Sequence, residues 1–154
     1  MIFDNLTDFA DSLTEYGAIG GLDLGTKTIG VAVSDHMRYI ATPLETIKRQ
    51  KFTQDAEHLL SICEGRALRG LILGLPRNMD GTEGPRAQST RAFARNLHQK
   101  TDLMISFWDE RLSTVAAEKA LLEADTTRKR RSEVIDHVAA SYILQGALDR
   151  LRHL

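Results

Sequence analysis

Apolar and polar positions alternate along the chain in two rhythms, which together predict an α/β protein. Short apolar runs predict five strands, over residues 19–24, 29–34, 41–47, 70–75 and 103–108. Helical spacing predicts helices over 52–63, 85–99, 113–123 and from Ser132 onward, with 124–131 as a polar, basic loop. A tight turn at Gly25-Thr26-Lys27 joins the first two strands. This order predicts a mixed five-stranded sheet flanked by helices on both faces.

The first 17 residues form a distinct acidic segment. They contain four acids and no Lys or Arg, and their apolar residues recur at helical spacing: Phe3, Leu6, Phe9, Ala10 and Leu13. We expect a helical extension over 1–17 that packs on a domain formed by 18–154. A secretory signal begins with basic residues and continues with an apolar run, so we expect no such signal here.

Length and composition are those of a single globular domain. The chain has 154 residues, of which 42% are apolar and 27% charged, and it can bury enough surface to fold without disulfides or a structural metal. No apolar run is long enough for a membrane-spanning helix. The single cysteine, Cys63, excludes a disulfide framework and a cysteine-based zinc site. We therefore expect a cytoplasmic protein with no membrane partner.

The charge balance does not by itself indicate nucleic-acid binding. The net charge of −1 comes from 20 basic and 21 acidic side chains. The basic residues are unevenly placed, however, with clusters at 48–51 (KRQK) and 128–131 (RKRR). A neutral average is therefore compatible with a basic face.

Three acidic positions lie where an open α/β sheet binds its ligands. Asp23 interrupts the first strand, Asp109-Glu110 follows the fifth, and Asp136 lies near the start of the last helix. Clustered carboxylates repel one another, and a hard divalent cation such as Mg²⁺, which prefers oxygen ligands, removes that cost. Two such ions activate a water and stabilise the leaving oxygen in phosphodiester cleavage. The constellation therefore predicts a metal-dependent nuclease.

Each acid also has a structural explanation when it is taken alone. Asp23 can accept hydrogen bonds from the turn that follows it, or pair with Lys27. Asp109 can cap the next helix while Glu110 forms an ion pair. Asp136 is favoured by the dipole of its helix. The nuclease interpretation therefore depends on the acids as a group.

Four ordered motifs resemble those of the YqgF-type, or RuvX-like, proteins of the ribonuclease H-like fold. The motifs are 21–34 (GLDLGTKTIGVAVS), 74–82 (GLPRNMDGT), 109–114 (DERLST) and 135–140 (IDHVAA). The resemblance covers about residues 19–151 and leaves out the acidic N-terminal segment. The family is described as Holliday-junction resolvases and as nucleases that mature the 5′ end of pre-16S ribosomal RNA. The resemblance implies hydrolysis of phosphodiester bonds with Mg²⁺, or with Mn²⁺ as the alternative ion.

The resemblance also implies which acids are catalytic. Asp23 matches the acid on the first strand, and Glu110 matches the acid of the Glu-Arg-Leu-Ser-Thr run. Asp136 matches the acid on the closing helix. We expect these three to be both catalytic groups and metal ligands. Asp109 adjoins Glu110 and should point elsewhere if the backbone is extended there.

Basic and polar residues near these acids are candidates for nucleic-acid contacts: Lys27, Asn78, Thr82, Arg91, Arg95, Arg128, Lys129, Arg130 and Arg131. Lys27 can instead neutralise the first catalytic acid, and Asn78 can serve only to build a turn. Arg91 and Arg95 share one helix face, which can be a solvated surface. As a loop before the last helix, the basic segment would overhang the cleft.

The favoured interpretation is a ribonuclease that acts on structured RNA or a pre-ribosomal particle, as a monomer or a homodimer. A Holliday-junction resolvase acting on DNA junctions is the first alternative, and it would favour a two-fold dimer. The second is a module that binds structured RNA or the ribosome and cuts nothing. Actin-like ATPases share the Asp-x-Gly-Thr pattern at 23–26, but they close two such domains around a nucleotide, and this chain has room for one.

Overall fold

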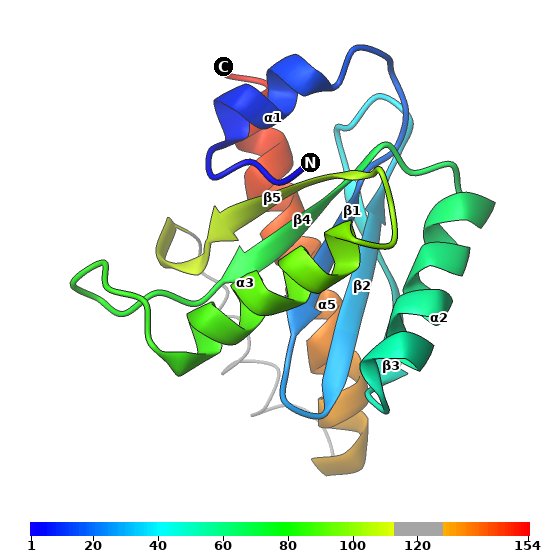
Figure 1. The fold of residues 1–154 in the computed structure, drawn as a ribbon, viewed down its shortest axis with the longest axis vertical. Helices are drawn as coiled ribbons and strands as arrows, with labels where there is room; N and C mark the ends of the chain where they lie inside the picture. Colours follow the sequence, from blue (N-terminus) through cyan, green and yellow to red (C-terminus); the bar gives the residue numbers. More distant parts are fainter. Residues whose placement is uncertain (113–127) are drawn as a thin grey trace.

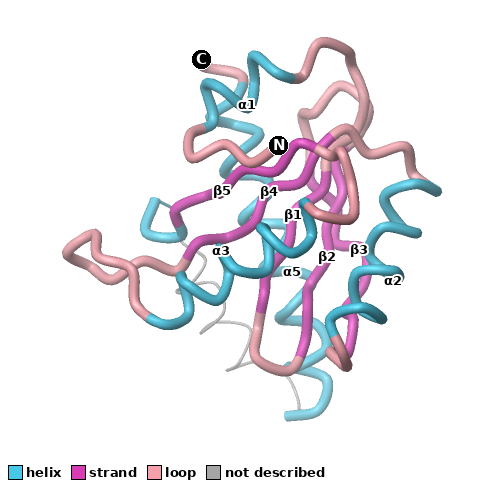
Figure 2. The backbone as a smooth tube through the Cα atoms, viewed as in Figure 1, coloured by secondary structure: helices cyan, strands magenta, loops and turns pink. Residues whose placement is uncertain are grey.

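The computed structural model describes residues 1–112 and 128–154, and in the last helix it describes side chains from His137 onward. The elements in chain order are α1 (Leu6–Ser12), β1 (Gly20–Leu24), β2 (Thr28–Ser34), β3 (Ala41–Lys48), α2 (Phe52–Gly65), β4 (Gly70–Leu75), α3 (Pro85–His98), β5 (Met104–Asp109), the short 3-10 helix η1 (Glu110–Leu112) and α5 (Arg128–Leu151) (Figures 1 and 2). The five predicted strands are confirmed, with ends that shift by no more than one residue. Among the described residues, no helix is long and apolar enough to cross a membrane.

The strands form one mixed sheet in the order β3-β2-β1-β4-β5. The β1–β2 and β2–β3 pairs are antiparallel, whereas β4 runs parallel to both β1 and β5. Each parallel connection needs a crossover, and α2 and α3 supply the two crossovers. The predicted mixed five-stranded α/β sheet is therefore confirmed.

Helices cover both faces of the sheet. In Figure 1, α2 and α3 lie on the near face and α5 runs along the far face. Leu22 of β1 belongs to the core formed with α2 and α3. Its neighbour Gly21 contacts α5, since a Cβ there would stand 2.6 Å from Cβ of Leu144. Because side chains alternate along a strand, Asp23 lies on the α5 face with Gly21.

The N-terminal segment is part of the same packed body. Residues 1–3 lie beside the edge strand β5, where the N–H of Phe3 donates to the carbonyl of Ile105 at 2.8 Å. The helix that follows is shorter than the predicted extension, and it buries Phe9 completely against α5 and Trp108. Pairing covers an edge that would otherwise present unpaired backbone groups.

The start of the last helix differs from the sequence-based prediction. The predicted helix over 113–123 and residues 124–127 of the predicted loop lie outside the described residues. The expectation that 128–131 belong to a loop is wrong, because α5 begins at Arg128 rather than after Ser132. Arg and Lys are good helix formers, and no Pro or Gly interrupts this segment. The side chains of Arg128, Lys129, Arg130 and Arg131 are outside the described set.

Candidate active site

The carboxyl ends of β1, β4 and β5 lie at one edge of the sheet, because these three strands are parallel (Figure 1). Asp23 is the last residue but one of β1, Leu75 ends β4, and Asp109 ends β5. Glu110 follows at the start of η1. In open α/β sheets this edge is where ligands bind.

Asp23 is a buried carboxylate between two glycines. Its side chain sits on the α5 face of the sheet, and the residue is 6% exposed. It pairs with Gly30 of β2 on one side. On its other side, β1 runs parallel to β4, and Leu22 pairs with Leu73. The next residue of β4, Gly74, therefore lies beside Asp23. Neither glycine has a side chain to fill the space beside Asp23.

Glu110 comes to the same face across Gly74. Its Oε1 atom lies 2.9 Å from the point where a Cβ on Gly74 would stand. Cδ1 of Ile143 on α5 lies 2.5 Å from the same point. The carboxylate of Glu110 therefore lies over β4, one strand away from Asp23, and neighbouring strands are about 4.8 Å apart. The structure brings these two predicted acids together.

Asp136 lies on the helix that covers this face. It belongs to α5, one turn before Ala140, whose carbonyl oxygen lies 3.1 Å from a Cβ position on Gly21. Ile143, one turn further along, packs over Gly74. The backbone thus puts Asp136 on the stripe of α5 that contacts the sheet. Its side chain is outside the described set.

Asp109 and Glu110 diverge although they are adjacent. The guanidinium of Arg111 donates to both carboxylate oxygens of Asp109, with an Nη2–Oδ2 distance of 2.6 Å. The N–H of Arg111 also donates to Asp109 Oδ1 at 3.0 Å, so Asp109 caps η1. These bonds from Arg111 hold the pKa of the Asp109 carboxyl below its ordinary value. Asp109 therefore has a structural partner on the other side of the strand end from Glu110.

The loop after β4 is built by its own hydrogen bonds. The Asn78 amide donates to Thr82 Oγ1 at 2.9 Å, and that hydroxyl donates to Asp80 at 2.6 Å. The Thr82 hydroxyl and N–H together hold the pKa of the Asp80 carboxyl below its ordinary value. Gly81 adopts a φ of +89°, which favours glycine. Asn78 and Thr82 are exposed, but both shape the loop.

The two predicted arginines of α3 have different surroundings. Arg91 donates to both carboxylate oxygens of Glu83, at 2.6 and 2.8 Å, and to Asp4 at 2.9 Å. Its guanidinium also lies over the Phe107 ring, 4.9 Å from the centroid. Arg95 is exposed, as is Lys27 in the β1–β2 turn. Arg91 therefore joins α3 to the loop and to the N-terminal segment.

A pocket of about 160 Å³ lies beside the β1–β2 turn and was missed by the sequence-based search. Its charged lining residues are Arg49, at the end of β3, and Arg86, in the first turn of α3. Arg49 belongs to the basic cluster at 48–51 that was noted in the sequence, but no sequence pattern singled out Arg86. The turn, β3 and α3 meet only in the folded chain.

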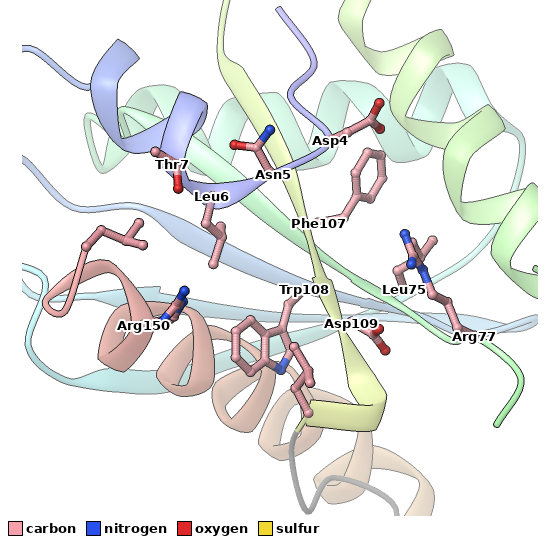
Figure 3. Close-up of a pocket in the computed structure, with 12 residues that line it drawn as sticks. Asp4, Asn5, Leu6, Thr7, Leu75, Arg77, Phe107, Trp108, Asp109 and Arg150 are labelled. Carbon is pink, nitrogen blue, oxygen red and sulfur yellow. The ribbon is translucent and has the colours of Figure 1, made fainter. Parts of the chain in front are cut away.

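A second pocket, of about 320 Å³, lies at the edge of the sheet near β5. Figure 3 shows Asn5 and Leu6 of the N-terminal segment on one side of it, and Arg77 and Asp109 on another. The charged residues that line it are of both signs: Asp4, Arg77, Asp109 and Arg150. An anionic nucleic-acid backbone would meet as many acids as bases there.

Comparison with known proteins identifies the family. A family model described as "RuvX: Holliday junction resolvase" matches residues 17–150. A curated protein of Ruegeria pomeroyi is 72% identical over 154 residues, covering 100% of both chains. One of Paracoccus denitrificans is 71% identical over 154 residues, covering 100% of this chain and 98% of the relative. Both relatives carry the name "Putative pre-16S rRNA nuclease".

Solved structures with the same fold are more distant in sequence. Thermus thermophilus RuvC, solved in complex with a Holliday junction substrate, has a TM-score of 0.55 at 10% identity, covering 89% of this chain and 97% of that chain. The yeast mitochondrial Holliday junction resolvase Ydc2 has a TM-score of 0.52 at 11% identity, covering 96% and 86%. These likenesses confirm the ribonuclease H-like fold. The family and the curated relatives confirm the expected class, a hydrolase of phosphodiester bonds. The chain belongs to the RuvX family.

Proposed function

We propose that this protein is a metal-dependent nuclease that processes the 5′ end of pre-16S ribosomal RNA. The observation that carries the proposal is the placement of Glu110 over Gly74, beside the buried Asp23 on the same face of the sheet. The substrate is taken from the names of relatives that are 72% and 71% identical over the whole chain. We place its action in the cytoplasm, on structured RNA or a pre-ribosomal particle, as a monomer or homodimer.

The proposed metal ligands are Asp23, Glu110 and Asp136. Carboxylate oxygens are the donors that Mg²⁺ prefers, and Mn²⁺ accepts the same set. The side chains described include no complete group of three such ligands, and the third proposed acid lies outside that set. The two acids that are described fit the ion, because both present carboxylate oxygens on the α5 face of the sheet, one from β1 and one across Gly74 of β4.

The sheet positions the two described acids for the proposed reaction. When bound, the metal ions supply a nucleophilic water and stabilise the leaving oxygen. Asp23 holds its position because β1 is paired on both sides, so its carboxylate is fixed before the substrate arrives. Glu110 reaches the same face from the end of a separate strand, and its carboxylate fits there because Gly74 has no side chain. A paired strand thus positions Asp23, and the end of a neighbouring strand positions Glu110.

The proposed nucleic-acid contacts divide into two groups. Lys27 and Arg95 are exposed cations, and Arg128, Lys129, Arg130 and Arg131 form a basic first turn of α5 close to the Asp136 position; these are proposed to contact backbone phosphates. Asn78, Thr82 and Arg91 are proposed to act through the loop that they hold together. The second group would orient the loop past β4, so that donors there can meet the substrate.

The test is a cleavage assay with two labelled substrates, a 5′-extended pre-16S RNA and a four-way DNA junction. Wild type and Asp23→Asn are each incubated with Mg²⁺, with Mn²⁺ and with chelator, once equal melting has been checked. We expect metal-dependent cutting of the RNA, lost in Asp23→Asn. Binding of either substrate without cleavage, unchanged by the substitution, would leave a non-catalytic RNA-binding or ribosome-binding module.

A Holliday junction resolvase is the second candidate, because the matching family model carries that description. A four-way junction is two-fold symmetric, so two coordinated cuts need two active sites related by the same symmetry. Metal-dependent cutting of the junction and not of the RNA would move the assignment to a resolvase. A dimer at the concentrations of the assay would be expected in that case.

A further inference from the structure

The pocket beside the β1–β2 turn has a lining of one charge sign. It lies between the turn, the end of β3 and the first two turns of α3. Its charged residues are Arg49 and Arg86, its hydroxyl residues are Thr26, Ser89 and Thr90, and no acid among the described side chains lines it. Phe93 and Leu24 supply the apolar part of the wall. This lining suits a small anionic group with several oxygen acceptors.

Main-chain carbonyls hold both guanidinium groups in place. Arg49 Nη1 donates to the carbonyl of Gly25 at 2.7 Å, and its guanidinium lies 5.8 Å from the centroid of the Phe93 ring. Arg86 Nη2 lies 3.4 Å from the carbonyl of Leu24. A guanidinium has five N–H donors, so each of these bonds leaves several donors available. The two cations are thus attached to the two residues that directly follow Asp23.

No carboxylate in the described part of the chain forms an ion pair with Arg49 or Arg86. Other arginines of the same molecule do have such partners: Arg69 with Glu15, Arg77 and Arg91 with Glu83, Arg111 with Asp109, and Arg152 with Asp149. Two cations brought to one pocket repel each other unless an anion joins them. The pocket therefore carries positive charge that the described part of the protein does not neutralise.

We propose that this pocket binds a backbone phosphate of the nucleic acid, next to the one that is cleaved. The proposal rests on the proposed nuclease function and adds a subsite to it. Asp23 faces α5, whereas Leu24 and the pocket lie on the α3 side of the same strand end. A nucleic-acid strand that crosses the end of β1 meets the carboxylate on one side and the two arginines on the other. The arginines act on any sequence, because phosphate contacts position a backbone without reading bases.

The experiment measures binding in chelator, which separates it from cleavage. Arg49→Gln, Arg86→Gln and the double variant are compared with wild type on the pre-16S RNA and on the four-way DNA junction, across a range of salt concentrations. Arg66→Gln is the matched control, since Arg66 is exposed at the far end of α2, about 20 Å along the helix from Phe52, which contacts Phe93 of the pocket. Arg49→Lys and Arg86→Lys keep the charge but not the forked donors, so they should keep the salt dependence of wild type and weaken binding less than glutamine does.

We expect each glutamine substitution to weaken binding about tenfold. Each should also lower the slope of log K against log salt by about 1, whereas Arg66→Gln leaves both unchanged. On the junction, single phosphates are then replaced by uncharged methylphosphonates. One replacement should weaken binding by wild type and leave the double variant unaffected. Thermal melting of each variant checks that it folds as the wild type does.

The possible outcomes test the phosphate site and the proposed nuclease function separately. Unchanged affinity and salt slope in the double variant overturn the phosphate site, even if Asp23→Asn abolishes cleavage. Arginine-dependent binding together with full cleavage by Asp23→Asn leaves the phosphate site standing and overturns the carboxylate site. A wild type that binds neither substrate overturns both proposals.

Discussion

The carboxylate of Glu110 occupies the space above Gly74, with Oε1 2.9 Å from the point where a Cβ would stand. Gly74→Ala places a methyl group there, and the methyl also meets Cδ1 of Ile143 at 2.5 Å. We expect Glu110 to be displaced and α5 to shift, because a packed interface has little room for an added carbon. Stability should fall by about 1–3 kcal/mol and cleavage by about 100-fold. Urea unfolding and single-turnover cleavage measure the two effects.

Gly65→Ala is the matched control for this substitution. A Cβ on Gly65 meets nothing within 4 Å, and the residue ends α2. We expect unchanged cleavage and equal or slightly greater stability. In a Glu110→Gln background, Gly74→Ala should cost little further activity, since both changes act on one carboxylate. Full additivity of the two losses would show that Gly74 acts through something other than Glu110.

Mg²⁺ should stabilise the wild type and not Asp23→Asn. A ligand that binds only the folded state adds about 2.7 kcal/mol at 100 times its Kd. The amide keeps the shape of Asp23 but removes the negative charge that a hard cation needs. Differential scanning fluorimetry across Mg²⁺ concentrations measures the rise in Tm without any substrate present.

A second buried acid serves as the control for the Mg²⁺ shift. Asp55 is 3% exposed and accepts a hydrogen bond from the N–H of Gln50 at 3.0 Å at the start of α2. We expect Asp55→Asn to lower Tm equally with and without Mg²⁺, because its role is to hold the helix start. An equal Mg²⁺ shift in wild type and Asp23→Asn would remove Asp23 from the metal site.

The strand pattern was predictable because strand signals are local. The apolar run at 70–75, bounded by Pro76, is β4 with the same ends. The start of α5 was not predicted, since the basic residues at 128–131 were taken as loop-forming although they favour helix. Pairing of residues 1–3 with β5 depends on an edge more than 100 positions away, which no local pattern reveals.

The candidate site was likewise predictable only in part from the sequence. Sequence placed Asp23 and Asp109-Glu110 at strand ends, and the family resemblance favoured Glu110 over Asp109, but no local pattern showed what separates the adjacent pair. The answer depends on Arg111, which binds Asp109, and on Gly74, which leaves room for Glu110. Arg49 and Arg86 were missed as a pair because a turn, a strand end and a helix start assemble their pocket.

The N-terminal segment should contribute strongly to stability. Phe9 is fully buried and its ring lies 6.3 Å from that of Phe3 in an edge-on arrangement. We expect Phe9→Ala to lower the free energy of unfolding by about 3–5 kcal/mol, because it leaves a cavity between α1 and β5. Tyr16→Ala, at a position that is 65% exposed, should change it by less than about 0.5 kcal/mol. A loss below about 1 kcal/mol for Phe9→Ala would mean that the segment is only loosely attached.

The ion pair between Glu83 and Arg91 should make the free energy of unfolding depend on pH. Two hydrogen bonds from Arg91 hold the pKa of the Glu83 carboxyl below its ordinary value of 4.5. A carboxyl whose pKa is lower in the folded state stabilises the fold above its unfolded pKa, and the contribution is lost as pH falls through the folded pKa. Glu83→Gln should therefore be less stable than wild type by about 1 kcal/mol at neutral pH.

That difference should shrink as the pH falls from the ordinary pKa of Glu83 through the lowered pKa of the folded state, because the carboxyl of the folded protein then becomes protonated and loses its charge. Urea unfolding of wild type and Glu83→Gln from neutral pH into this acid range measures it. Glu57→Gln, at an exposed position on α2, should match wild type at every pH. A difference for Glu83→Gln that stays constant with pH would assign its effect to packing around the loop rather than to the charge that Arg91 binds.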